Sequence, residues 1–193
     1  MTLYSGGLLF DGREMHDGMG VLVEGEQVAE VAPLGQFEGY AGPRVDTAGG
    51  TLMPALIDAH VHVLLPPGVD AFNQIVRWGH GDFVIQGVEN LRVFLEGGIS
   101  AIRDMSGQHY LEMRLRDAIA AGRVTGPVLR CAGKHIVMTG GHVPQSARIA
   151  DNPDEVRKAT REQIGAGGHQ GRRVVERDAA DGGDRHPEFA PRA

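Results

Sequence analysis

"TLMPALIDAHVHV", residues 51–63, is the most informative stretch of this chain. Pro54 stops the segment before it, and the mostly apolar run of residues 55–63 is typical of a strand buried on both faces. The run ends in His60 and His62. Side chains two residues apart point to the same side of a strand, so the spacing predicts that both imidazoles project together from the strand end, with Asp58 deeper on that side.

The two histidines permit two interpretations. Imidazole is a common zinc ligand, with a Zn–N distance of about 2.1 Å, and two rings on one face make half of a zinc site. A strand can equally carry His60 and His62 as ordinary core or surface residues. The position at the end of the first strand of an α/β series favours ligands, because α/β barrels build their sites at the C-terminal ends of their strands.

The segments that follow alternate between strands and helices. Apolar residues recur at helical spacing over residues 83–96, and glycines close that helix. Further strands are predicted at 99–105 and 127–133, and further helices at 110–121 and from Pro153 onward. This order predicts a parallel α/β unit.

The first quarter of the chain has a different pattern. Short apolar runs at 21–23 and 28–31, joined at Gly25-Glu26, predict a β-hairpin, and other extended pieces surround it. Residues 1–54 are therefore predicted to form a small β unit.

Several stretches resemble one family. "LMPALIDAHVHV" (52–63) resembles the metal-ligand motif of the amidohydrolase superfamily, metal-dependent hydrolases built on a (β/α)8 barrel. "GGISAIRDM" (97–105) resembles the second barrel strand of that family. "RCAGKHIVMTGGH" (130–142), followed by "PDEVRKATREQIGAG" (153–167), resembles the imidazolonepropionase-related branch, which includes prolidase-like dipeptidases.

The resemblance implies an α/β fold. Residues 55–167 would be the N-terminal portion of a (β/α)8 TIM barrel, left incomplete, and residues 1–54 half of a composite β-sandwich-type unit before it. His60 and His62 would be metal ligands for one or two divalent ions, with zinc the expected metal. The reaction would be hydrolysis of C–N bonds in amides, peptides or cyclic amides by metal-activated water. A small molecule or dipeptide would be the substrate, and the full-length form could be a homo-oligomer.

The glycine-rich stretch after the third barrel strand is a second candidate region. By resemblance, Gly140, Gly141 and His142 would contact substrate, although a glycine turn with an exposed histidine is the alternative. Arg103 and Asp104 are expected to brace the mouth of the barrel. The remaining polar residues of this region, His80, His109 and His135, have no spacing partner and are interpreted as ordinary polar residues, and Lys134 precedes the place of the family's carboxylated lysine.

Other parts of the family's site find no match. The carboxylated lysine after strand four, the histidines after strands five and six and the aspartate after strand eight cannot be assigned, so no catalytic residue is predicted. A full barrel takes about 250 residues, whereas residues 56–193 are all that follow the β unit. We therefore expect an incomplete, inactive fragment. The alternative is a non-catalytic truncated barrel that acts only as a binding or association module.

Net charge, the N-terminal sequence and the cysteine content limit the kinds of partner and the cellular compartment that we expect. The formal net charge is −6, which gives no indication of a nucleic-acid or anionic-membrane partner. The N-terminus has no signal-peptide pattern, and no apolar stretch approaches the roughly 18 residues of a membrane span. Cys131 is the only cysteine, which fits a reducing compartment, so we expect a cytoplasmic protein.

Residues 168–193 break the pattern. This mixed-charge tail has no helical or strand period, and it begins where the family continues into barrel strand four. Reading the codons one nucleotide further on permits Ala-Ile-Lys-Val-Val-Val over residues 168–173. We therefore interpret the tail as a non-native frameshift product, the alternative being a genuine disordered extension. A stop codon soon after codon 167 in the shifted frame would contradict the frameshift.

Overall fold

The structure is a computed structural model that describes residues 1–168. The chain divides into two compact units, Met1–Ala55 and a second unit that begins at Leu56. The predictions for the tail, that it is a frameshift product or a disordered extension, lie outside the described residues apart from Gly168.

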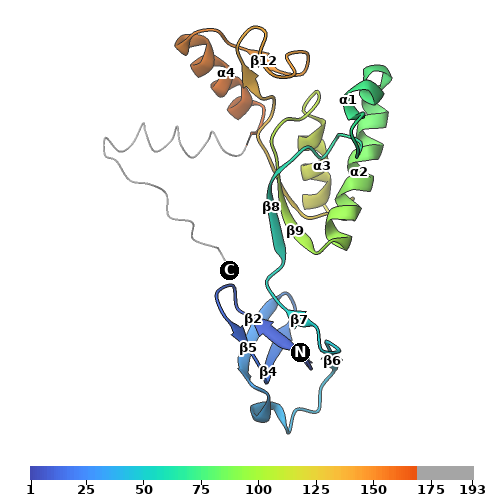
Figure 1. Cartoon of the computed structure of the whole chain (residues 1–193), viewed down its shortest axis with the longest axis vertical. Helices are drawn as coiled ribbons and strands as arrows, with labels where there is room; N and C mark the ends of the chain where they lie inside the picture. Colours follow the sequence, from blue (N-terminus) through green and yellow to red (C-terminus); the bar gives the residue numbers. More distant parts are fainter. Residues whose placement is uncertain (169–193) are drawn as a thin grey trace, which may run out of the picture. The chain divides into compact units, whose positions relative to one another are not determined.

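The first unit is built from short strands (Figure 1). One sheet has the strand order β5-β4-β1-β6 and another the order β3-β2-β7. The predicted hairpin is confirmed, since β4 and β5 pair antiparallel around the turn at Gly25-Glu26. Leu3 and Phe37 are among the residues that form its core. The elements are β1 (Thr2–Ser5), β2 (Leu8–Phe10), β3 (Met15–His16), β4 (Met19–Glu24), β5 (Gln27–Pro33), η1 (Leu34–Phe37), β6 (Arg44–Asp46) and β7 (Thr51–Leu52).

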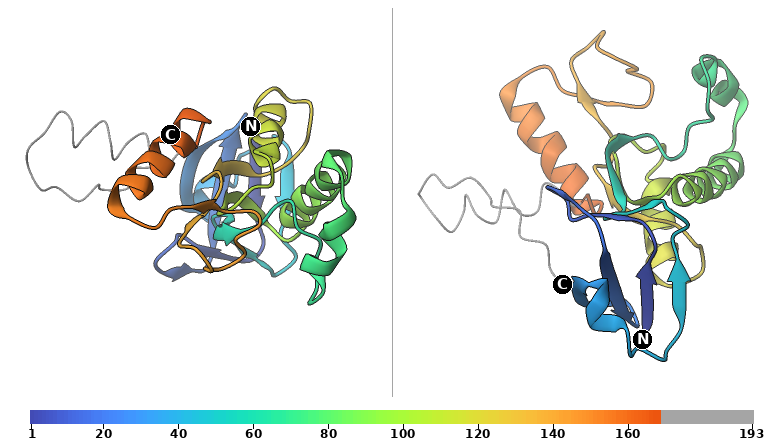
Figure 2. Two further views of the ribbon diagram at one scale, coloured as in Figure 1. Left: turned by 90° about the horizontal axis from the view of Figure 1, so that it is seen from above. Right: turned by 60° about the horizontal axis from the view of Figure 1, so that its bottom comes forward.

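The second unit opens with the predicted parallel sheet. Strands β8 (Leu56–Val61), β9 (Ile99–Asp104) and β10 (Val128–Cys131) lie in the order β10-β9-β8, and both pairings are parallel. Helix α2 (His80–Glu96) connects β8 to β9, and α3 (Leu111–Ala120) connects β9 to β10. Figures 1 and 2 show both helices on the same side of the strands. The expected fold class, an α/β chain with an incomplete barrel, is confirmed.

The core of this unit lies between the strands and the two helices. Val61, Ile102 and Leu129, one from each strand, are buried against Leu91 of α2 and Leu115 of α3. The helices approach closely at Gly87, where a Cβ atom would lie 2.4 Å from Leu115 Cδ1. This packing fixes the C-terminal ends of β8 and β9 side by side, and these ends carry the candidate site.

Two further pieces follow β8 and β10. Residues after β8 form α1 (Ala71–Gln74) and η2 (Ile75–Arg77), which sequence periodicity did not predict. Residues after β10 form a two-stranded parallel sheet of β11 (Ile136–Val137) and β12 (Arg148–Ile149). Helix α4 (Pro153–Gly165) then begins where predicted, because the side chain of Asn152 accepts hydrogen bonds from two amides of its first turn.

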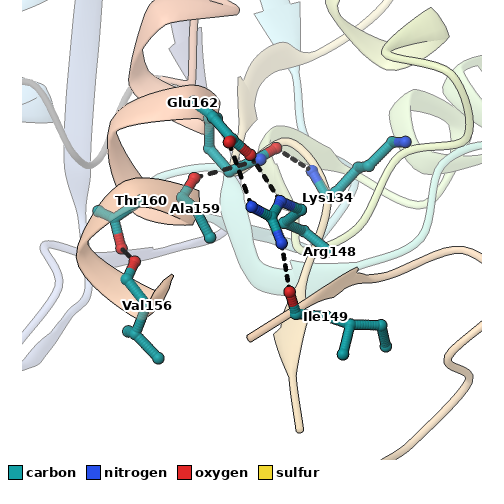
Figure 3. Close-up of polar contacts among 8 residues, drawn as sticks. Lys134, Arg148, Ile149, Val156, Ala159, Thr160 and Glu162 are labelled. Carbon is teal, nitrogen blue, oxygen red and sulfur yellow. Dashed lines mark hydrogen bonds and ion pairs between the residues drawn. The ribbon is translucent and has the colours of Figure 1, made fainter. Parts of the chain in front are cut away.

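Helix α4 is fastened to the segment that carries the glycine-rich stretch (Figure 3). Arg148 of β12 makes two contacts with Glu162, at 2.6 and 3.2 Å, and also donates to the carbonyl of Ile149. Gln163, which is 6% exposed, accepts a 2.8 Å hydrogen bond from the backbone amide of Lys134. These bonds hold both ends of residues 134–148 against one helix.

Among residues 1–168, strands β8 and β10 each have a neighbour on one side only. Apolar side chains on these strands are correspondingly open to solvent, with exposed fractions of 73% for Ile57 and 59% for Val128. No helix in the described part of the chain is both long enough and apolar enough to span a bilayer.

Candidate metal centre at the strand ends

His60 and His62 lie beside one another at the end of β8. Their ring centroids are 5.5 Å apart with the planes nearly perpendicular, so the prediction that they project together is confirmed. The strand is not regular there, because its register with β9 shifts between Asp58 and Val61. Asp58 turns back and accepts a 3.0 Å hydrogen bond from the amide of His60, so its carboxylate caps the local backbone.

The surroundings of His62 disfavour the protonated form of its ring. Partial burial lowers its pKa below the ordinary value of 6.5, and the neighbouring charge of His60 lowers it further. A hydrogen bond to the backbone of Ser106 acts in the opposite direction and orients the ring. A neutral imidazole whose second nitrogen is engaged by backbone is the usual state of a metal-ligating histidine.

Asp104, at the end of β9, braces this corner from beneath. It is fully buried, and its two carboxylate oxygens accept hydrogen bonds from the amides of Val63 at 2.7 Å and Ser106 at 3.0 Å. One carboxylate thereby ties the residue after His62 to the loop that follows β9. Burial raises the pKa of Asp104 to about 6, although both hydrogen bonds and the charge of His60 act against that rise. The expected bracing role of Asp104 agrees with this geometry.

The glycine-rich stretch lies in the loop between β11 and β12. Gly140 has a φ of +75°, and a Cβ atom on Gly141 would lie 2.9 Å from the carbonyl oxygen of Met138, so the backbone itself requires glycine at both positions. The base of the loop is fixed by Thr139, whose amide and hydroxyl both donate to Asp151 at 2.6 Å. The exposed ring of His142 lies close enough to His62 for its charge to lower the pKa of His62.

The structure brings His135 into the same region, which sequence reasoning missed. Its ring lies 2.6 Å from the hydroxyl of Ser106 and 3.0 Å from the carbonyl oxygen of His142, and its charge also lowers the pKa of His62. The sequence reasoning that gave His135 no partner therefore missed these contacts. Its only sequence signal is its position directly after the third barrel strand, at the mouth where strand ends meet.

Two other histidines also meet. The rings of His80, at the start of α2, and His109, in the loop after β9, lie 4.6 Å apart, so they too have a partner that spacing did not reveal.

The described residues fit one part of a divalent metal site. His60 and His62 offer two adjacent imidazoles, and that of His62 has a lowered pKa and a hydrogen bond to the backbone of Ser106. Across residues 1–168, however, no group of three or more His, Cys, Asp or Glu side chains is arranged to hold a metal ion. The described residues thus provide two candidate metal ligands, His60 and His62, and the residues that hold them in place.

Comparison with known proteins finds similar solved structures. An amidohydrolase of known structure superposes with a TM-score of 0.72 and 27% identity, over 86% of this chain and 45% of that chain. A prolidase complexed with N-methylphosphonate-L-proline superposes with a TM-score of 0.69 and 27% identity, over 86% of this chain and 44% of that one. Over the part of their length that it covers, the chain is similar to proteins of the amidohydrolase superfamily.

Sequence comparison finds a match over a shorter region of the chain. Adenine deaminase from Chelativorans sp. (strain BNC1) is 40% identical over 43 residues, which are 22% of this chain and 7% of that protein. No family model matches the chain. The chain thus spans less than half of the solved structures and a small fraction of the curated relative, and its relatives are hydrolases of C–N bonds.

Proposed function

We propose that this chain carries the first part of the active site of a metal-dependent amidohydrolase that hydrolyses amide, peptide or cyclic amide bonds. The observation that supports the proposal is the pair His60 and His62 at the end of β8, with the ring of His62 oriented by Ser106. A small molecule or a dipeptide is the proposed substrate. A cytoplasmic location and a homo-oligomeric full-length form remain predictions.

In this proposal the chain's own residues bind and orient. His60 and His62 would hold a divalent ion, with zinc the proposed metal, and Asp104 would keep the two ends of β8 and β9 in register beneath it. When bound, such an ion activates water and polarises the scissile carbonyl. Gly140, Gly141 and His142 would line the substrate side, a placement supported by the effect of the His142 charge on the pKa of His62.

The second part of the proposal is that residues 1–168 do not complete the metal site. A tetrahedral ion needs more than two protein ligands, and the described residues arrange no third one. We therefore propose that this chain alone does not turn over substrate. The competing function, a non-catalytic association module, is favoured by the uncovered edges of β8 and β10.

Metal titration separates the two functions. Zinc binding is measured by calorimetry on the wild-type chain and on the double variant H60A/H62A, with H80A/H109A as a matched control that removes the other adjacent imidazole pair. We expect H60A/H62A to bind zinc at least about tenfold more weakly and the control to bind like wild type. Equal affinities in all three proteins would favour the association module.

Turnover is then assayed on the zinc-loaded chain with dipeptides and cyclic amides. We expect no hydrolysis above that of the H60A/H62A variant. Hydrolysis that depends on His60 and His62 would support the enzyme class and contradict the proposed inactivity of this chain.

A further inference from the structure

The imidazole of His135 connects two loops at the strand ends. One ring nitrogen, Nε2, lies 3.0 Å from the carbonyl oxygen of His142, and the other, Nδ1, lies 2.6 Å from the hydroxyl of Ser106. A carbonyl oxygen can only accept, so Nε2 must carry the proton and donate. In the neutral ring Nδ1 is then the acceptor, and the Ser106 hydroxyl donates to it. The partners thus select one tautomer.

Both partners of this ring are themselves anchored. Ser106 donates its amide to the buried carboxylate of Asp104, and its backbone also holds the ring of His62. His142 lies in the loop whose base is fixed by the Thr139–Asp151 bonds. The chain of contacts therefore runs from His62 through Ser106 and His135 to His142.

The backbone of His135 is equally fixed. Its carbonyl oxygen accepts a 2.8 Å hydrogen bond from the amide of Arg148, whose side chain is paired with Glu162 of α4 (Figure 3). The preceding residue, Lys134, donates its amide to Gln163. A ring with two directed hydrogen bonds on a backbone held at both sides is suited to positioning a flexible neighbour.

We propose that His135 is a positioning residue that locks the loop of residues 138–147 to the strand end bearing His62. Through Nε2 it fixes the backbone of His142, and through Ser106 it sets that backbone relative to the His62 ring. The purpose of this lock, to hold His142 at the metal-binding mouth, rests on the proposed function. The lock itself rests on the contacts alone.

Hydrogen–deuterium exchange of the full chain, resolved to single amides, tests the lock. The reporters are the amides of Gly141 and Ser146, which bond to carbonyls inside the loop, and the internal control is the amide of Thr139, which is held separately by Asp151. His135→Phe keeps an aromatic ring and removes both nitrogens. We expect the two reporter amides to exchange about fivefold faster and the Thr139 amide to be unchanged.

Two further variants separate hydrogen bonding from shape. His135→Gln retains one donor and one acceptor and should restore most of the protection, whereas Ser106→Ala should give a smaller increase than His135→Phe. His80→Phe, a histidine outside this network, should leave the loop as in wild type. Unchanged exchange in His135→Phe, or equal acceleration in His135→Phe and His135→Gln, would overturn the lock.

A spectroscopic measurement addresses the tautomer directly. Long-range ¹H–¹⁵N correlation of the histidine rings should show one ring, absent in His135→Gln, with a protonated Nε2 and an unprotonated Nδ1. Protonation at Nδ1 alone would overturn the assignment. These readouts need no metal, so their failure is distinguishable from a failure of zinc binding.

Discussion

Replacing Glu112 by glutamine should make the folded chain less sensitive to alkaline pH. Glu112 lies in the first turn of helix α3 and is fully buried, and neither of its carboxylate oxygens has a hydrogen-bond partner in another described residue. Burial, and then the carboxylate of Asp104, raise the pKa of Glu112 from 4.5 to about 7, while Arg116 acts in the opposite direction. The buried thiol of Cys131 has a raised pKa and adds no charge of its own.

The sign of the effect follows from proton binding. Between the unfolded pKa of 4.5 and the folded pKa of about 7, the folded chain holds a proton that the unfolded chain has released. The free energy of unfolding therefore falls as pH rises through this window and levels off above it. The full loss corresponds to about 3 kcal/mol, and the raised pKa of Asp104 acts in the same direction.

Glutamine has the shape of the protonated acid and cannot ionise. Below pH 5 the variant and the wild type should therefore have nearly equal thermal midpoints. At pH 8.5 the Glu112→Gln midpoint should be higher by roughly 6–12 °C, the equivalent of about 3 kcal/mol in a chain of this size. Scanning fluorimetry at low protein concentration measures the shift, with Glu89→Gln on the exposed face of α2 as a control. A Glu112→Gln shift that is the same at both pH values would refute the reasoning.

Two shorter predictions concern the brace and the sheet edge. Asp104→Ala leaves the buried amide of Val63 and the partly buried amide of Ser106 without their acceptor, and should lower the free energy of unfolding by about 1–3 kcal/mol, measured by denaturant titration. The open edges of the parallel sheet should make the isolated chain prone to association, and Ile57→Lys on β8 should reduce light scattering, whereas Ile85→Lys, equally apolar but on a helix, should not. A wild-type chain that is a monodisperse monomer with a cooperative melt would contradict the second prediction.

Much of the second unit follows from local pattern. The helix of α2 and the strand of β9 lie within a few residues of their predicted bounds, because apolar spacing and terminal glycines report directly on local conformation. The placement of His60 and His62 on one side is also local, since it depends only on a spacing of two residues. In contrast, α1 carries no period long enough to be detected.

What pattern could not reveal are contacts between loops. His135 meets Ser106, which lies 29 residues away, and the ring of His80 meets that of His109. Such pairs arise only when parallel strands bring successive loops and helix starts to one edge, and no spacing along the chain encodes them. The buried, unpaired state of Glu112 was invisible for the same reason, since its position at a helix start is ordinarily solvated.

Raising the pH should have opposite effects on zinc binding by His60 and His62 and on the stability of the core that contains Glu112 and Asp104. Metal binding requires neutral imidazoles, so the affinity of His60 and His62 for zinc should rise as pH increases. The free energy of unfolding of the core falls as pH rises over an overlapping range. Burial disfavours the ionised forms of Glu112 and Asp104, and the charge of Asp104 disfavours the ionised form of Glu112 further. The lowered pKa of His62 eases this conflict, because it favours the neutral form of one ring. If this is correct, Glu112→Gln should extend zinc binding to higher pH without changing its onset at low pH, because the substitution removes only the destabilisation of the support.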